Sequence, residues 1–178
     1  MRHCWRKPST ARWVAVAPFS AHPGKVYPLE RMREVVMRLA DDKSMHIFLM
    51  GGGEQERNVL DSWAKEHDNV TSVAGIPHTF ADELALLARC DVMVSMDSAN
   101  MHLASLVNLP TVSVWGATHP DCGFMGHHQQ LNHAVQLDLE CRPCSVFGER
   151  PCRHSDYRCL TGITPEQILN KVTEIITQ

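Results

Sequence analysis

Residues 92–102, VMVSMDSANMH, decide the fold. The first half of this stretch is a run of apolar and branched residues, which is typical of a buried strand. The run stops at Asp97 and Ser98, and a helix-compatible segment with a histidine one turn in follows at once. A strand that leads directly into a helix is one unit of an alternating α/β fold. The polar residues at the junction indicate that its chemistry lies there.

The start of this helix allows two interpretations. In the first, unpaired backbone N–H groups and the helix dipole attract an anion. Small residues at Ser98 and Ala99 then let a phosphate approach the backbone, and His102 lies four residues after Ser98 on the same helical face. In the second, Asp97 or Ser98 is only a helix cap, and His102 is a satisfied, half-buried histidine.

The alternation of strand and helix continues on both sides of this stretch. Strands are expected within residues 13–19, 46–50, 69–75, 91–96, 111–116 and 133–138. Helices are expected over residues 29–42, after residue 53, over 80–88, over 100–107 and over 165–177. The last helix begins with TPEQ, a capping-box signal at Thr164 and Gln167. This pattern predicts a doubly wound, Rossmann-like parallel sheet with right-handed crossovers.

The loops after the strands carry most of the candidate chemistry. They read SAHPGK, GGGEQE, GIPH, DSANMH and GATHP, and they are rich in glycine and polar residues. Ligands of such sheets bind beyond the carboxyl ends of the strands. We therefore expect residues 20–25, 51–56, 97–102 and 116–119 to meet at one edge of the sheet.

Two of these loops contain residues whose role the sequence leaves open. Lys25 follows His-Pro-Gly and is either a ligand-binding or a solvated surface lysine. The GGGEQE loop has the spacing of neither a Walker loop nor G-x-G-x-x-G. Gly52 and its neighbours permit a close backbone approach, and Glu54 or Glu56 can accept hydrogen bonds from ribose hydroxyls. The alternative is a glycine turn followed by an acidic first helical turn.

A cysteine-rich segment, residues 141–159, precedes the last helix. It reads CRPCSVFGERPCRHSDYRC and contains Cys141, Cys144, Cys152 and Cys159, with His154 among them. A Cys-x-x-Cys followed by further cysteines is a spacing that a structural zinc ion can use. Labile disulfides and reduced thiols that pack a loop are the alternatives.

The composition excludes several classes of protein. A length of 178 residues predicts one domain, and a formal net charge of -3 argues against nucleic acid as a partner. No apolar run reaches the roughly 18 residues of a membrane span, and the N-terminus lacks the apolar core of a signal peptide. Seven cysteines, an odd number, argue against a fully paired disulfide scaffold. A cytoplasmic protein is expected.

The loops together resemble a known family. The stretches APFSAHPGKVYPLERM, MGGGEQE and VAGIPHTFADELALLARCDVMVSMDSANMHLASLVNLPTVSVWGATHP are similar to the C-terminal half of the ADP-heptose:lipopolysaccharide heptosyltransferases, glycosyltransferase family nine. The resemblance runs from about residue 13 to residue 120. It implies a GT-B fold, in which two Rossmann-like domains face each other across a cleft. The C-terminal domain of that fold binds the nucleotide-sugar donor.

The resemblance also implies roles for individual residues around the donor diphosphate. Lys25 matches the lysine that holds the diphosphate, and Ser98 and His102 match the diphosphate-binding turn and helix start. The family usually has glycine where this chain has Ala99. A methyl group there keeps the backbone N–H, so phosphate binding remains expected.

Four further residues match positions around the rest of the donor. Asp97 matches the acid associated with the donor sugar, and Thr118 matches the threonine of the family's Gly-x-Thr-x-Pro loop. Glu54 or Glu56 falls where an acid contacts the ribose, and the gap placement leaves both open. Neither Lys25 nor His102 belongs to an apolar face, so we expect alanine at either position to change stability little.

These implications combine into one expected function. Residues 13–178 are the donor-binding domain of an inverting, metal-independent glycosyltransferase without a catalytic cofactor, preceded by an arm at residues 1–12. The donor is an ADP-heptose-like nucleotide sugar, and the acceptor is lipopolysaccharide core or a related glycan. The catalytic base is expected in an N-terminal domain outside this chain, so the chain binds donor without transferring it. At most a peripheral association with the inner face of the bacterial inner membrane is expected. The alternatives are another nucleotide sugar, or a nucleotide-binding module without turnover.

Overall fold

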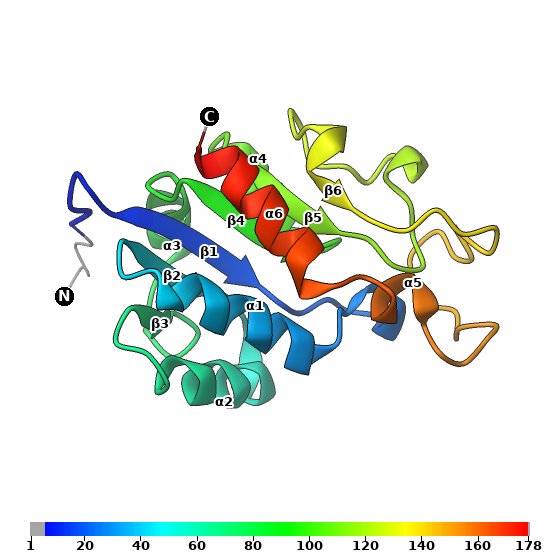
Figure 1. Cartoon of the computed structure of the whole chain (residues 1–178), viewed down its shortest axis with the longest axis horizontal. Coiled ribbons are helices and arrows are strands. Elements are labelled where there is room, and N and C mark those ends of the chain that lie inside the picture. Colours follow the sequence, from blue (N-terminus) through cyan, green and yellow to red (C-terminus); the bar gives the residue numbers. More distant parts are fainter. Residues whose placement is uncertain (1–5, 178) are drawn as a thin grey trace.

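The computed structural model describes residues 6–177 and contains a six-stranded sheet in which every pairing is parallel (Figure 1). The strands are β1 (Arg12–Ala17), β2 (Met45–Leu49), β3 (Val70–Ser72), β4 (Val92–Met96), β5 (Thr111–Val114) and β6 (Ala134–Val135). Their order is β3-β2-β1-β4-β5-β6. The winding reverses between β1 and β4, where such folds bind their ligands. The predicted doubly wound sheet is confirmed.

Helices cover both faces of the sheet. They are α1 (Leu29–Asp41), α2 (Gly53–Ala64), α3 (Phe80–Leu87), α4 (Ala99–Leu106), α5 (Arg158–Thr161) and α6 (Pro165–Ile176). Buried residues of α1, α2 and α6 pack on one face, and those of α3 and α4 pack on the other. Figure 1 shows α1 and α6 in front of the strands, with α3 and α4 behind them.

The central strand β1 shows why both faces need cover. Val14 and Val16 belong to the core beneath α1 and α6, whereas Trp13, Ala15 and Ala17 belong to the core beneath α3 and α4. Successive side chains of a strand point to opposite faces, so a strand buried on both sides is apolar throughout. This is the unbroken apolar pattern that predicted β1 and β4.

The boundaries of some elements differ from the prediction. β1 ends at Ala17, two residues early, and β6 is two residues long where six were expected. β6 is an edge strand that pairs only with β5. Beyond Val135 the chain leaves the sheet, because the Gln136 side chain and the Leu137 carbonyl bond to Arg142 instead. The four-residue helix α5 was not predicted.

Two helices begin with a complete capping box. The predicted one, at Thr164 and Gln167, starts α6 and is confirmed. The other, at Thr79 and Asp82, starts α3. Each box satisfies two backbone N–H groups that a helix start leaves unpaired.

All strands run parallel, so the loops after β1, β2, β4 and β5 emerge at one edge of the sheet, the C-terminal edge (residues 20–25, 51–56, 97–102 and 116–119). In Figure 1 the arrow of β1 points toward this edge, beside α5 and the cysteine-rich segment. Across residues 6–177, no helix has the length and apolar character that crossing a membrane demands.

Candidate functional site

Asp97 contacts residues of two other loops at the C-terminal edge. It follows β4 directly, is only 3% exposed, and its Oδ2 lies 2.9 Å from Lys25 Nζ. The same oxygen accepts a 2.8 Å hydrogen bond from Thr118 Oγ1, and the Asp97 carbonyl accepts one of 2.9 Å from Ser20 Oγ. One buried acid thus ties together the loops that follow β1, β4 and β5. The predicted convergence of these loops is confirmed.

Close backbone contact between the loops after β1 and β5 holds this arrangement. The Gly24 carbonyl accepts a 2.8 Å hydrogen bond from the Ala117 N–H. A Cβ on Gly116 would lie 2.4 Å from that same carbonyl oxygen, and a Cβ on Gly24 would lie 2.8 Å from the Ala117 Cβ. Only glycine fits at either position. These contacts hold together the two loops that carry Lys25 and Thr118, which both bind Asp97 Oδ2.

The burial of Lys25 contradicts the expectation that alanine at this position changes the stability of the protein little. Its side chain is 13% exposed and pairs with a carboxylate that is 3% exposed. Removing one partner of such a pair leaves an uncompensated buried charge, which is strongly destabilising. An ammonium group has three donors, so the bond to Asp97 leaves others for a ligand. The interpretation of Lys25 as a solvated surface lysine is wrong.

Helix α4 begins at Ala99 without a side-chain cap. Ser98 occupies the N-cap position in extended conformation, but its hydroxyl makes no capping bond and lies 3.2 Å from Ser95 Oγ. The interpretation of Asp97 or Ser98 as a plain cap is therefore wrong, because the Asp97 carboxylate is bound to other loops. Half-burial of His102 is also wrong: His102 is exposed on the first turn. Uncapped N–H groups thus lie next to Asp97.

The glycine loop after β2 forms the start of α2. Gly53 has a φ of +74°, a conformation that favours glycine, and Gly52 is the N-cap residue. Glu56 Oε2 accepts a 2.8 Å hydrogen bond from the Gly52 N–H, so this acid caps the helix. Glu54 is exposed in the same first turn. The structure separates two acids that the sequence left equivalent.

Arg142 is a residue that sequence reasoning missed. Its guanidinium donates hydrogen bonds to the carbonyls of Gly116, Leu137 and Thr118, the last at 2.8 Å, and to Gln136 Oε1 at 3.0 Å. Burial lowers the pKa of Arg142, an effect that nearby thiols partly oppose. Its partners on the β5 loop lie at least 24 residues away in sequence. Arg142 therefore joins the cysteine-rich segment to the loop that carries Thr118.

The structure does not support the zinc prediction. Within residues 6–177, no group of three or more histidine, cysteine or acidic side chains is placed to hold a metal ion. Cys159 lies on α5 and packs into the apolar core, while Cys141, Cys144 and Cys152 are partly exposed free thiols. Charge interactions link Arg142 to Cys141, Cys144 and Cys159, so a protein cation already lies near these thiols.

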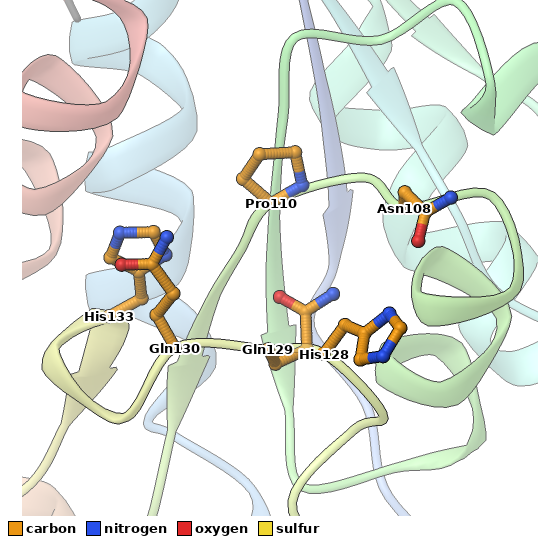
Figure 2. Close-up of a pocket in the computed structure, with 6 residues that line it drawn as sticks. All are labelled: Asn108, Pro110, His128, Gln129, Gln130 and His133. Carbon is orange, nitrogen blue, oxygen red and sulfur yellow. The ribbon is translucent and has the colours of Figure 1, made fainter.

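A separate hollow of about 150 Å³ lies at the opposite edge of the sheet, before β5 and β6 (Figure 2). Its lining residues are mostly polar: Asn108, Pro110, His128, Gln129, Gln130 and His133. Gln129 is committed to the fold, because its amide bonds to the Thr111 N–H and the Leu109 carbonyl. His133 is 4% exposed, and neither ring nitrogen has a hydrogen-bond partner among residues 6–177. This hollow is not part of the C-terminal edge.

Burial of His133 predicts a loss of stability in mild acid. Burial lowers the pKa of His133; on α6, Glu174 opposes this effect and Lys171 adds to it, both by smaller amounts. Burial also lowers the pKa of His46. The unfolded chain then binds protons more readily than the native one below about pH 6.5, so the free energy of unfolding should fall as pH drops. Denaturant titrations from pH 7.5 to 5 would show this, with a shallower fall for His133→Leu. Equal slopes for both proteins would refute it.

Comparison with known proteins agrees with this geometry. A family model described as glycosyltransferase family 9 (heptosyltransferase) matches residues 3–154. Lipooligosaccharide heptosyltransferase 2 of Campylobacter jejuni is 24% identical over 145 residues, which cover 81% of this chain and 45% of that protein. Lipopolysaccharide heptosyltransferase 2 of Escherichia coli K12 is 25% identical over 166 residues, 88% of this chain and 44% of that protein. The chain thus spans a little under half the length of these relatives.

Solved structures show the same fold. The E. coli ADP-heptose lipopolysaccharide heptosyltransferase II matches with a TM-score of 0.73 at 20% identity, over 96% of this chain and 48% of that one. A family 9 glycosyl transferase from Veillonella parvula matches with a TM-score of 0.72 at 19% identity, over 96% and 47%. The family model covers most of the residues from β1 to the cysteine-rich segment, including every loop of the C-terminal edge. The chain belongs to glycosyltransferase family 9, the heptosyltransferase family.

Proposed function

We propose that the chain is the donor-binding part of a glycosyltransferase that transfers heptose from an ADP-heptose-like donor to lipopolysaccharide core or a related glycan. The names of the curated relatives support this choice, and so do solved structures of E. coli heptosyltransferase WaaC with ADP and with ADP-2-deoxy-2-fluoro heptose. The observation that carries the proposal is the Lys25 ammonium fixed by Asp97 beside the uncapped start of α4.

This arrangement suits a diphosphate. The N–H groups of the N-cap residue Ser98 and of Ala99, the first residue of α4, lack a side-chain cap and can donate to phosphate oxygens. Asp97 holds the Lys25 ammonium in place before any ligand arrives, and the exposed His102 ring lies one turn into the helix. Donors that are already oriented stabilise charge as it develops on a leaving group. The nucleoside diphosphate that leaves during transfer carries such charge.

The remaining residues of the edge take the other parts of the donor in this proposal. Gly52 lets the nucleotide approach the backbone, and Glu54 or Glu56 accepts hydrogen bonds from the ribose. Glu54 is the more available of the two, because Glu56 caps α2. Asp97 and Thr118, which are joined by a hydrogen bond, are assigned to the sugar side.

The proposed reaction is inverting and metal-independent. A base removes the proton of the acceptor hydroxyl, which then attacks the anomeric carbon as the diphosphate leaves. Alignment of acceptor and donor supplies several kcal/mol of barrier lowering. We assign the base and the acceptor site to a part of the protein outside these 178 residues, since the curated relatives are about twice as long.

Titration calorimetry with ADP, UDP, GDP and ADP-heptose tests the proposal. The chain should bind ADP and ADP-heptose in preference to the others. His102→Ala should weaken ADP binding by about 1–3 kcal/mol, the range for losing a charge-assisted contact. Its thermal midpoint should stay unchanged, because His102 is exposed.

His67→Ala is the matched control, since His67 precedes β3 at the opposite edge of the sheet. It should leave ADP affinity unchanged. Preference for UDP-sugars or GDP-sugars would point to another nucleotide sugar. Failure to bind any nucleoside diphosphate would contradict the proposal.

A further inference from the structure

An aromatic pair, Phe124 and Phe147, lies beside the Lys25–Asp97 ion pair. The ring centroids of the two phenylalanines are 5.6 Å apart in an edge-to-face arrangement. Lys25 Nζ lies 5.9 Å from the centroid of the Phe124 ring. Phe147 is nevertheless 56% exposed, and Val146 next to it is 53% exposed. Exposed apolar side chains that cluster, unlike scattered single ones, are typical of ligand-binding surfaces.

The turn that carries Phe147 is built from specific contacts. Glu149 accepts hydrogen bonds from Ser145 Oγ and the Phe147 N–H, and the Ser145 bond is the main reason that the pKa of Glu149 is lowered. The Gly148 N–H donates a 3.0 Å hydrogen bond to Ser145 Oγ. The hydroxyl of Ser145, a buried residue, therefore orders the turn from inside.

The same turn packs directly on the site. Gly148 has a φ of +79°, and a Cβ there would lie 2.7 Å from the Lys25 Cγ. On the loop after β1, a Cβ added to Gly24 would lie only 3.0 Å from the Gly148 carbonyl oxygen. On the loop after β5, the Ala117 carbonyl accepts a 3.0 Å hydrogen bond from the Cys144 N–H. The loops after β1 and β5 thus fix the position of the Phe147 ring relative to Lys25.

The order of the strands places this pair on one side of the diphosphate site. Lys25 and the start of α4 follow the central neighbours β1 and β4, whereas the glycine loop with Glu54 follows β2. Phe124 follows β5, on the other side of the diphosphate site. A nucleotide sugar with its nucleoside over the β2 loop and its diphosphate at Lys25 directs its sugar toward β5.

We propose that Phe124 and Phe147 form a subsite for the pyranose ring of the donor's transferred sugar. The apolar C–H face of the ring packs against the exposed Phe147, while Asp97 and Thr118 lie close to its hydroxyls. This inference rests on the proposed function, and it assigns the exposed turn of the cysteine-rich segment to sugar recognition. Aromatic side chains bring a large apolar contact area to such a site.

Calorimetry with two probes, ADP and ADP-heptose, tests the subsite. Phe147→Ala should lower the affinity for ADP-heptose on the order of tenfold and leave the affinity for ADP unchanged. Phe147→Trp should retain ADP-heptose binding. Leu131→Ala is the control, because Leu131 is also 56% exposed but lies before β6 at the opposite edge.

The other outcomes separate the two proposals. An equal loss for ADP and ADP-heptose would mean that Phe147 contacts the nucleotide, which overturns the sugar subsite. Unchanged binding of both probes would overturn it as well. If Phe147→Ala loses affinity only for a heptose-terminated oligosaccharide, the Phe147 ring contacts the acceptor and not the donor, which overturns the donor assignment. Failure of the unaltered chain to bind ADP or ADP-heptose would overturn the proposed function itself.

Discussion

Replacing Lys25 with methionine should lower the free energy of unfolding by about 3 kcal/mol, because it leaves the Asp97 carboxylate buried without its cation. Asp97 is 3% exposed, and within residues 6–177 the hydroxyl of Thr118 is the one hydrogen-bond donor left to its carboxylate. Methionine keeps most of the apolar stem that packs on Gly148, so the change isolates the charge. Chemical denaturation followed by circular dichroism measures the effect.

A double-mutant cycle with Asp97→Asn separates the ion pair from packing. Asn at position 97 removes the buried charge, so the double variant should be more stable than Lys25→Met alone. ADP affinity should fall in every variant that lacks the ammonium, including the double variant, because removing the charge of Asp97 does not restore the donor that contacts the phosphate. A Lys25→Met protein with the unfolding midpoint of the unaltered chain would show that the pair contributes nothing to stability.

The fold was predictable because its signals are local. The apolar runs of β1 and β4 are continuous, since both faces of these strands are buried, and the glycine and polar loops follow each strand directly. Parallel pairing then follows from the short links between strands and helices. The edge strand β6 was overestimated because its length depends on contacts with Arg142, which no local pattern encodes.

The sequence predicts which loops carry the site residues better than it predicts the contacts between those residues. The sequence places Lys25, Asp97 and Thr118 in three loops, and parallel topology brings those loops to one edge. It does not reveal that a single buried oxygen of Asp97 binds both of the other side chains. The two contacts join Asp97 to residues 72 and 21 positions away in sequence, and they give Lys25 a structural role besides the ligand-binding role proposed for it.

The cysteine-rich segment shows the limit of spacing as evidence. Cys-x-x-Cys followed by two more cysteines is a spacing that a zinc ion can use, although the second pair is looser than in a usual zinc knuckle, and spacing does not state which side chains point inward. Here Cys159 enters the apolar core. Within the Cys-x-x-Cys, Arg142 binds the β5 loop through its guanidinium and Cys144 through its backbone N–H, and neither contact follows from the spacing.

Replacing Arg142 with methionine should lower the free energy of unfolding by about 2–4 kcal/mol, since it leaves several buried carbonyl groups without a donor. The carbonyls of Gly116 and Thr118 belong to buried residues of the loop that positions Thr118 against Asp97. Loss of their donor should therefore also weaken ADP-heptose binding. Arg142→Lys should recover only part of the stability, because an ammonium cannot reproduce the planar fork of a guanidinium.

Arg153→Met is the matched control for Arg142→Met. Arg153 lies in the same cysteine-rich segment but is exposed, so its replacement should leave both the unfolding midpoint and ligand affinity nearly unchanged. Urea denaturation and calorimetry of the two variants decide the matter. If Arg142→Met and Arg153→Met behave alike, the bonds of Arg142 to the β5 loop do not hold Thr118 in place. If Arg142→Met alone loses stability and ADP-heptose affinity together, the bonds of Arg142 to the β5 loop are needed for the proposed donor site.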